Sequence, residues 1–272
     1  MATPPKKRVA EAAPAQVPKA VVNRLSFYLR ELQHLLRDGQ VTISSSQLGR
    51  LLGFTDAQVR KDLAYFGHFG YPGIGYRCEE LVTAIRKILA TDESWNVALI
   101  GAGNLGRALL GYGGFEQQGF RVIAAFDADP NMEGKSIGEV PVFAMEKLGK
   151  MVPERNIKLA IIAVPAPAAQ KVADQLVEAG IEGILNFAPV TISLPANVSQ
   201  VGVDLAIELE QLSFSVVNRK FAARRKANRA NEANQKANSG ELGVDAFDDD
   251  DEADLESPNQ LTPGDVMEGD SA

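Results

Sequence analysis

Leucines near the start of the chain repeat at helical spacing. Five of them share one stripe: Leu25, Leu29, Leu32, Leu35 and Leu36. Such a stripe predicts an amphipathic helix with one buried face. Asp38-Gly39 follows directly, and a glycine at that position suits the end of a helix.

Two short helices are expected next. The run Ser44–Ser46 supplies an N-cap for a helix over 47–52, and Gly53 ends that helix. Thr55–Gln58 has the spacing of a capping box and opens another helix, which runs to about Phe66. A short helix, a glycine turn and a second capped helix are typical of a helix-turn-helix motif.

The second helix of this motif has two different sides. Val59, Leu63 and Phe66 lie on the side expected to be buried. The opposite side combines cations with small residues: Ala57, Arg60, Lys61, Ala64 and His68. Such a helix can lie close to the floor of a DNA groove, with Arg60 pairing with guanine or phosphate. An ordinary solvated face with one Arg and one Lys is the alternative.

Glycines and aromatic residues alternate over 68–76, which favours a β-ribbon. Its glycines allow the backbone to approach a minor groove. A further helix is expected over 79–89, with acids in its first turn and Arg86-Lys87 in its last. Helix-turn-helix plus ribbon predicts a winged helix. Tyr65, Tyr71 and Tyr76 either contact DNA or pack inside this domain.

The pattern changes near residue 95, where short apolar runs alternate with helical segments. The expected strands are Val97–Ile100, Val122–Asp127, Leu159–Val164, Gly183–Phe187 and Gln200–Asp204. The expected helices are Leu105–Gly111, Met145–Lys150, Ala168–Ala179 and Leu205–Phe221. Buried β-branched strands separated by helices predict an α/β fold with a doubly wound parallel sheet of the Rossmann type.

A GxGxxG motif closes the first of these strands and opens a helix, which is the context that dinucleotide binding requires. Gly101 makes the turn, Gly103 admits the pyrophosphate and Gly106 lets the helix pack. The next strand ends at Asp127, whose carboxylate can bind both ribose hydroxyls and repels a 2′-phosphate. The motif therefore favours NAD(H) over NADP(H).

The last expected helix is apolar on two sides. One stripe comprises Leu205, Leu209, Leu212 and Val216, and the other Ile207, Phe214, Val217 and Phe221. A helix with two apolar faces must be covered twice. We expect its own sheet to cover one face and a second subunit the other.

Composition and charge refine this interpretation. Of the 272 residues 45% are apolar, which suffices for a core, and no apolar run is long enough to span a bilayer. No apolar segment follows Lys6-Lys7-Arg8, so we expect a cytoplasmic protein without a secretory signal. The single cysteine, Cys78, excludes a disulfide framework and a thiolate metal cluster.

The net charge of −7 is distributed unevenly. Residues 1–95 carry +4 and residues 96–217 carry −5, whereas residues 218–240 carry +6 and residues 241–272 carry −12. The acidic total therefore does not argue against nucleic acid, because most of the acid lies at the end of the chain.

General acids and bases are scarce around the glycine motif. Both histidines, His34 and His68, lie in the helical half. A dehydrogenase needs such a group near the hydride acceptor. The first hypothesis is therefore a DNA-binding protein that binds NAD(H). An NAD-linked oxidoreductase is the second hypothesis, and a CoA- or nucleotide-binding module is the third.

Several of these segments together resemble the Rex family of redox-sensing transcriptional repressors. They are Ser45–Leu48, Gln58–Leu63, Tyr65–Gly67, Gly73–Tyr76, Gly101–Gly106, Phe126-Asp127 and Ile184–Pro189. The resemblance covers about 20–221 in unbroken order. It implies a homodimer that binds operator DNA through its winged helix and senses NADH against NAD⁺ through its Rossmann domain. NADH is implied to release the DNA, and the terminal helix to be exchanged between subunits.

Site residues follow from the motifs and the resemblance together, and domain limits follow from the changes in pattern and composition along the chain. The DNA-binding set is Ser45, Ser46, Gln47, Arg60, Lys61, Tyr65 and Gly73. The cofactor set is Gly101, Ala102, Gly103, Asn104, Leu105, Gly106, Asp127, Pro165, Asn186 and Ala188. A network of Arg30, Tyr112 and Asp204 is implied between the two domains, and neither a metal site nor a catalytic residue is expected. The expected divisions are a disordered arm over 1–19, a winged helix over 20–92, a Rossmann domain over 93–204, a dimerisation helix over 205–221 and a disordered tail over 222–272.

Overall fold

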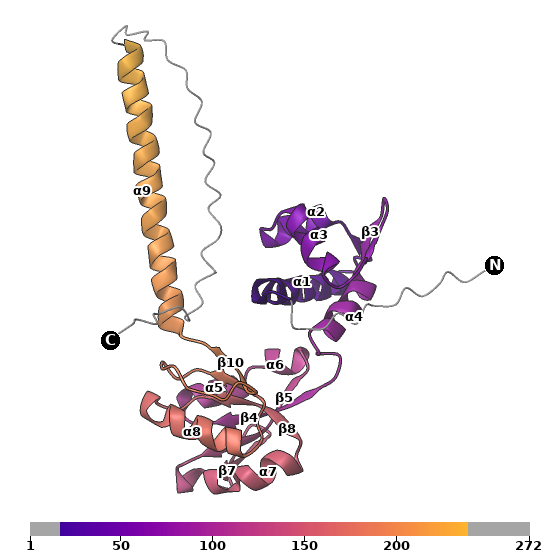
Figure 1. Cartoon of the computed structure of the whole chain (residues 1–272), viewed down its shortest axis with the longest axis vertical. Coiled ribbons are helices and arrows are strands. Elements are labelled where there is room, and N and C mark those ends of the chain that lie inside the picture. The colour runs from indigo at the N-terminus through magenta and orange to yellow at the C-terminus, as the bar shows by residue number, and fades with distance from the viewer. Residues whose placement is uncertain (1–16, 239–272) are drawn as a thin grey trace, which may run out of the picture. The chain divides into compact units, whose positions relative to one another are not determined.

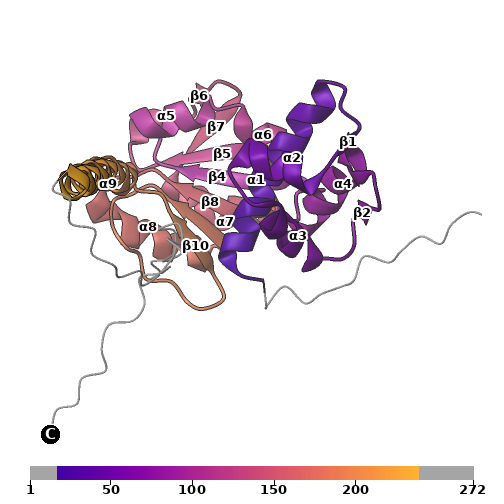
Figure 2. The same cartoon turned by 90° about the horizontal axis from the view of Figure 1, so that it is seen from above.

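The computed structural model describes residues 17–238, and Figures 1 and 2 draw its helices and strands from two directions. The first part is helical, with α1 (Lys19–Arg37), α2 (Ser45–Leu52), α3 (Asp56–Ala64) and α4 (Cys78–Ile88). Three short strands accompany them: β1 (Thr42–Ile43), β2 (Gly70–Tyr71) and β3 (Gly75–Arg77). They form an antiparallel sheet in the order β1-β3-β2. The winged helix is thereby confirmed, with β2 and β3 as its wing.

Capping residues fix the turn between α2 and α3. Ser44 accepts from the backbone N–H of Gln47 and the Gln47 side chain accepts from the N–H of Ser44, which completes a capping box. Gly53 takes the left-handed conformation at the end of α2. Thr55 caps α3, but the reciprocal half of its expected capping box is wrong: the Gln58 side chain donates to Asp62 instead.

The second part contains a sheet of seven strands. They are β4 (Trp95–Ile100), β5 (Phe120–Asp127), β6 (Ser136–Ile137), β7 (Val140–Ala144), β8 (Ile157–Ile162), β9 (Gly183–Asn186) and β10 (Ser199–Gly202). Their order is β10-β9-β8-β4-β5-β7-β6, and all pairs are parallel except β6 with β7. If β4 is numbered as strand 1 and the edge strand β6 is left out, the sheet has the strand order 3-2-1-4-5-6 of the Rossmann fold. The expected parallel sheet is confirmed, and the antiparallel edge strand is an addition that the sequence did not predict.

Helices cover the two faces of this sheet unequally. On one face, α7 (Leu148–Glu154) and α8 (Ala166–Glu178) pack against Ile100, Phe126 and Ile162. On the other, α5 (Asn104–Leu110) and α6 (Gly114–Gln117) pack against Leu99 and its neighbours. The 3-10 turns η2 (Pro130–Met132) and η3 (Met145–Lys147) flank β6 and β7. Because α5 follows β4 on one face and α8 follows β8 on the other, the winding of the chain reverses between these two strands.

The last helix, α9 (Leu205–Asn238), belongs to a separate unit, because the chain divides between Leu205 and Ala206. The helix is longer than expected: residues 222–238 were predicted to be part of a disordered tail, with a frayed helix as the alternative, and the structure continues α9 through them. Their Ala, Arg, Lys and Gln content explains this, because these residues have high helix propensity. The rest of the expected tail, 239–272, and most of the expected N-terminal arm lie outside the described residues. No described helix is long and apolar enough to cross a membrane.

Candidate DNA-binding and dinucleotide-binding sites

A buried carboxylate attaches α3 to α1. Asp62 on α3 has no exposed surface, yet it accepts four hydrogen bonds. Arg24 donates two, from Nε at 2.6 Å and from Nη2 at 2.8 Å, and the Tyr28 hydroxyl and the Gln58 amide donate one each at 2.7 Å. The axis of α3 is thereby held against α1 by a directional network in addition to apolar packing.

The protonation states in this network follow from its geometry. Burial favours the neutral acid, but the hydrogen bonds from Arg24, Tyr28 and Gln58 outweigh it and hold the pKa of Asp62 below its ordinary value. Burial and the bond to Asp62 together raise the pKa of the Tyr28 phenol. At neutral pH Asp62 is therefore ionised and Tyr28 remains a donor.

The outward side of α3 is cationic, as expected. Val59, Leu63 and Phe66 are buried, while Arg60 and Lys61 are exposed. Arg60 is also oriented: its Nη1 lies 2.6 Å from the Asp56 carboxylate and 3.2 Å from the hydroxyl of Ser45 on α2. The structure thus brings Ser45, at the start of α2, beside the cation expected to face DNA. The bond from Arg60 holds the pKa of Asp56 below its ordinary value.

Side chains at the base of the wing are fixed to α4. The Tyr71 hydroxyl donates to Glu80 at 2.9 Å, and Arg77 pairs with the same carboxylate at 3.0 Å while lying 4.9 Å from the centre of the Tyr71 ring. Tyr76 is a core residue, whereas Tyr65 and Tyr71 are 41% exposed and stay available for DNA. The packing alternative therefore applies to the buried Tyr76, whereas Tyr71 combines contacts to Glu80 and Arg77 with an exposed ring.

The glycine loop after β4 shows why three glycines are needed. Gly101 has φ of +96°, and a Cβ on Gly106 would lie 1.9 Å from the carbonyl oxygen of Gly101. Gly103 differs, because a Cβ there would meet no protein atom within 4 Å. The space over Gly103 is open at the start of α5, where backbone N–H groups can bind a pyrophosphate. The exposed Asn104 and Leu105 form the first turn of that helix.

Asp127 lies at the end of β5 beside this loop. Its Oδ2 accepts from the backbone N–H of Ala102 at 2.6 Å, and its Oδ1 accepts from the N–H of Asp129 at 2.8 Å. The long sequence spacing between Gly101 and Asp127 therefore does not separate them in space. Each carboxylate oxygen retains capacity for a further donor, such as a ribose hydroxyl.

The loop after β9 is shaped by Asn186. Its side-chain nitrogen donates to the carbonyl of Val190 at 2.9 Å, and its oxygen accepts from the N–H of Ala188 at 3.0 Å. Because both ends of the amide are bonded within the loop, Asn186 positions Ala188 at this edge of the sheet. Pro165 lies across the same edge, after β8, as the N-cap residue of α8.

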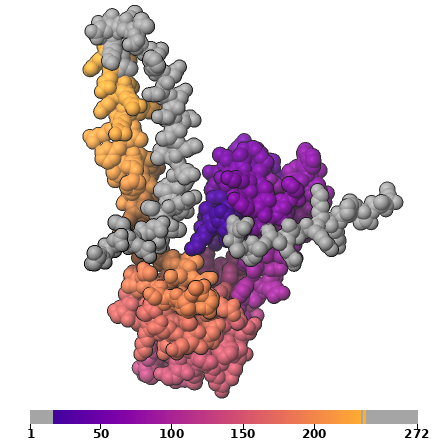
Figure 3. Space-filling view, viewed as in Figure 1, coloured from indigo at the N-terminus to yellow at the C-terminus, as the bar shows by residue number. Residues whose placement is uncertain are grey.

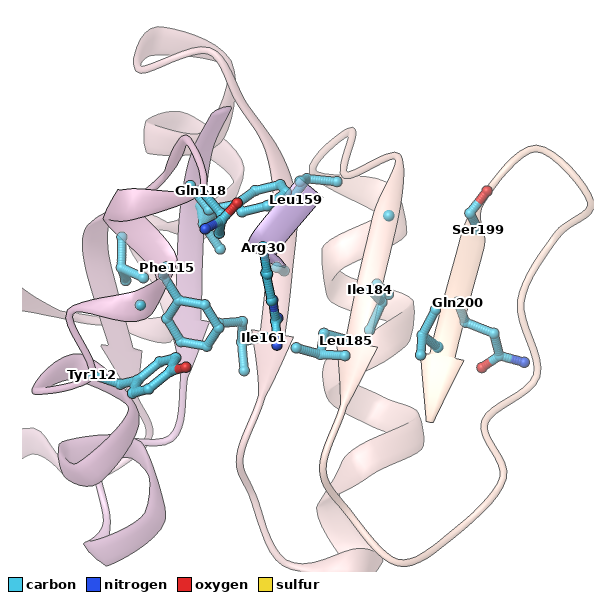
Figure 4. A pocket seen from close by; sticks show the side chains of 17 residues that line it. Arg30, Tyr112, Phe115, Gln118, Leu159, Ile161, Ile184, Leu185, Ser199 and Gln200 are labelled. Atoms are coloured by element: carbon cyan, nitrogen blue, oxygen red, sulfur yellow. The ribbon is translucent and has the colours of Figure 1, made fainter. Parts of the chain in front are cut away.

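An apolar groove of about 460 Å³ crosses the sheet face that carries α5 and α6 (Figure 4). Strands β8, β9 and β10 form its floor through Leu159, Ile161, Leu185 and Val201, and α6 contributes Phe115 to its side. Arg30 of α1 and Tyr112, two members of the implied network, both line it. Asp204, the third member, directly precedes α9.

Two contributors were not expected from the sequence. Asp62 was noted only as part of the segment Gln58–Leu63, and its ion pair with Arg24 was not predicted. Arg24 is 38 residues away in the sequence, and no local pattern marks the pair. Gln118 was also missed, although its amide donates to Gln33 of α1 at 3.1 Å and joins the winged helix to the Rossmann domain. Pairing between distant polar residues cannot be detected from the periodicity of a single sequence.

Comparisons with known proteins agree with this division of the chain. A family model described as "Putative DNA-binding protein N-terminus" matches residues 16–64, and one described as "CoA binding domain" matches residues 92–190. A winged helix joined to a dinucleotide-type sheet defines the class of DNA-binding regulators that carry a nucleotide-binding domain. The chain belongs to the Rex family of redox-sensing transcriptional repressors.

Named relatives and solved structures support this assignment. The redox-sensing transcriptional repressor Rex of Carboxydothermus hydrogenoformans is 47% identical over 201 residues, which are 74% of this chain and 97% of the relative. Rex of Streptomyces coelicolor is 44% identical over 73% of this chain and 77% of its own. The structure of RSP with β-NAD⁺ and operator DNA has 37% identity and a TM-score of 0.71, covering 78% of this chain and 97% of RSP. RSP with β-NADH gives 36% and 0.70, covering 77% of this chain and 98% of RSP.

Proposed function

We propose that this chain represses transcription by binding operator DNA and that NADH, in competition with NAD⁺, releases it. One observation carries the proposal: the same chain presents the cationic face of α3 and a glycine loop closed by Asp127. RSP, which is similar over nearly its whole length, has been solved with NAD⁺ and operator DNA and with NADH. Acting on DNA and on the NADH pool, the chain would work in the cytoplasm.

On the DNA side, α3 enters the major groove and Arg60 pairs with guanine or phosphate. The start of α2 contacts the sugar-phosphate backbone of the DNA through Ser45, Ser46 and Gln47. Lys61 and Tyr65 contact the DNA beside them. The bonds of Arg60 to Ser45 and Asp56 support this role, because an oriented guanidinium loses less conformational entropy on binding. Gly73, with φ of +75° at the tip of the wing, lets the backbone approach the minor groove.

On the cofactor side, the pyrophosphate lies over Gly103 and the start of α5, and Asp127 accepts from the adenosine ribose. The nicotinamide lies at the edge formed by Pro165, Asn186 and Ala188, where ligands of doubly wound sheets bind. NADH lacks the positive charge of the oxidised ring, so a poorly hydrated pocket there favours the reduced form.

The proposed assembly is a homodimer in which α9 packs on a second copy. All eight residues of its two apolar stripes are exposed within the chain, from 37% for Val216 to 66% for Leu209. Large exposed apolar surfaces indicate contact sites. The apolar groove over β8, β9 and β10 is a matching surface for the partner's α9.

For the switch, we propose that Arg30, Tyr112 and Asp204 connect the cofactor site to the winged helix. Arg30 and Tyr112 line one groove, and Asp204 begins the segment that leads into α9, which supports their participation. A change in nicotinamide charge at the sheet edge would then alter how these residues pair.

Two other functions are alternatives to this proposal, and a single titration distinguishes them from it. A hydride-transferring enzyme lacks support, since His34 and His68 are both in the winged-helix part of the chain. A CoA-binding module is favoured by the family description over 92–190, but Asp127 suits a ribose diol. Titrating an operator gel shift with NADH, NAD⁺ and CoA separates these functions. Release by NADH alone is expected, whereas release by CoA, or no shift of any promoter DNA, would overturn the proposal.

A further inference from the structure

A basic segment occupies the middle of α9, beyond the apolar stripes. It contains six cations within eleven residues: Arg219, Lys220, Arg224, Arg225, Lys226 and Arg229. No carboxylate interrupts the sequence between Glu210 and Glu232, and every side chain from 219 to 229 is exposed. The segment is the yellow-orange part of the helix in Figure 3. Such a concentration of one charge on a single helix calls for an anionic counterpart.

The cations also repel one another along the helix. Lys220 with Arg224 and Arg225 with Arg229 are like charges four residues apart, an arrangement that destabilises a helix. At about 100° per residue the six side chains point around the whole circumference, with no gap wider than about 100°. A flat anionic surface could meet only part of them. A flexible polyanion that wraps the helix could meet them all.

The residues that follow α9 carry the negative charge that such an interaction needs. Residues 241–272 contain 12 Asp and Glu and no Lys or Arg, with the densest run at Asp248–Asp254. We propose that this acidic tail folds back onto the basic segment of α9 and neutralises it within the same chain.

The lengths allow this. From Arg219 to the helix end at Asn238 is about 28 Å at about 1.5 Å per residue. The ten residues from Asn238 to Asp248 can span up to about 33 Å when extended, so the acidic run reaches every cation of the segment. A tethered partner acts at an effective concentration in the millimolar range, which favours the chain's own tail over a separate polyanion such as DNA.

The contact can be detected by zero-length carbodiimide crosslinking of the full chain, which joins carboxylates to lysine amines. At low salt we expect Lys220 or Lys226 linked to the carboxylates of 245–256, recovered from the band of a single chain. The links should disappear at about 1 M salt, where the Debye length is about 3 Å. Links from the tail to Lys61 of α3 instead, links found only in a two-chain band, or no links would each overturn the proposal.

A second measurement separates the tail from DNA as the ligand. The full chain with Asp248→Asn, Asp249→Asn, Asp250→Asn, Asp251→Asn and Glu252→Gln should bind non-operator DNA about three-fold or more tightly at low salt, with a steeper salt dependence. Adding Arg224→Gln, Arg225→Gln and Arg229→Gln should remove that gain. In the chain with its native tail, the three Gln substitutions should change the affinity less than about two-fold.

If the three Gln substitutions weaken DNA binding equally with either tail, the segment binds DNA and the proposal fails. It also fails if neutralising the tail changes nothing. The control for net charge neutralises five exposed carboxylates that precede α9: Asp92→Asn, Glu93→Gln, Glu139→Gln, Glu146→Gln and Glu178→Gln. The crosslinking arm is independent of operator recognition and NADH, so its failure would leave the proposed function untouched.

Discussion

Asp62 brings a negative charge into the core of the winged-helix domain, and its environment decides the consequence. An unpaired buried carboxylate would be costly, but donors from two helices surround this one. The same contacts fix the orientation of α3, which carries Arg60 and Lys61 on its exposed side. At the scale of single residues, therefore, stability and DNA contact meet on one helix.

Replacing Asp62 by Asn should destabilise the domain, because it leaves the Arg24 guanidinium without its ion partner. We expect a loss of about 3 kcal/mol in the free energy of unfolding, at the low end for a broken buried pair because the Arg24 side chain keeps 21% exposure. Denaturant unfolding of both proteins measures it. The control is Asp56→Asn, which removes an exposed carboxylate from the same helix. An equal loss in both variants would contradict the network's role.

The pH dependence of the same network has a definite sign. The folded pKa of Asp62 lies below its ordinary value of 3.8, so its stabilising contribution is complete above that pH. It is lost as the pH falls through the lowered folded pKa. Stability measured from pH 5 downward should therefore fall more steeply for the native chain than for Asp62→Asn. Parallel curves would show that folding does not lower the pKa of Asp62.

Arg60→Ala should weaken operator binding without changing NADH affinity, because the side chain lies on the outer face of α3. The expected cost is about 1–3 kcal/mol if the contact to guanine is bidentate. Operator and NADH affinities measured on the same preparation test this. Lys87→Ala, which removes an exposed cation from α4, is the matched control. An unaltered operator affinity for Arg60→Ala would remove α3 from the recognition role.

At the scale of elements, the glycine loop between β4 and α5 separates folding from binding. Gly106 allows the helix to approach the carbonyl of Gly101, whereas Gly103 faces open space. The two glycines of this motif, Gly103 and Gly106, therefore have different roles. One serves the packing of the loop and the other serves the proposed ligand.

Gly103→Ala should keep the fold and weaken NADH, while Gly106→Ala should destabilise the Rossmann domain itself. The added methyl at Gly106 meets a backbone oxygen at 1.9 Å, so we expect about 3 kcal/mol or more of lost stability. Thermal unfolding with and without NADH distinguishes the two variants. If Gly103→Ala binds NADH as tightly as the native chain, the pyrophosphate does not lie over Gly103.

Much of the architecture could be predicted because it depends on local patterns. Buried β-branched runs located β4, β5, β8 and β9, and capping residues located α2 and α3. The strand β6 and the helix α6 were missed, because two and four residues are too few for a detectable period. The strand β7 was missed because Pro141, which cannot donate a backbone hydrogen bond, interrupts its apolar run. The glycine loop and Asp127 followed from motif context. The bonds that hold Asp127, Asn186 and Asp62 did not, since they depend on how distant segments meet.

At the level of the whole molecule, the two apolar stripes of α9 are exposed within the described residues. Leu209→Glu together with Phe214→Glu places one charge on each stripe and should convert a dimer into monomers. Sedimentation or light scattering measures the change in mass. Gln211→Glu adds a charge in the polar gap between the stripes and should leave the dimer intact. A dimeric double variant would show that subunits associate elsewhere.

In the proposed switch, operator DNA and NADH compete through the conformation of one protein. Linkage requires that if NADH weakens operator binding by some factor, operator DNA weakens NADH binding by the same factor, commonly about 5- to 150-fold. The most direct measurement is therefore the NADH affinity of the full chain, by titration, with and without saturating operator. We expect a weaker NADH affinity with the operator and no such change with a scrambled duplex. Identical NADH affinities with and without operator DNA would contradict the account.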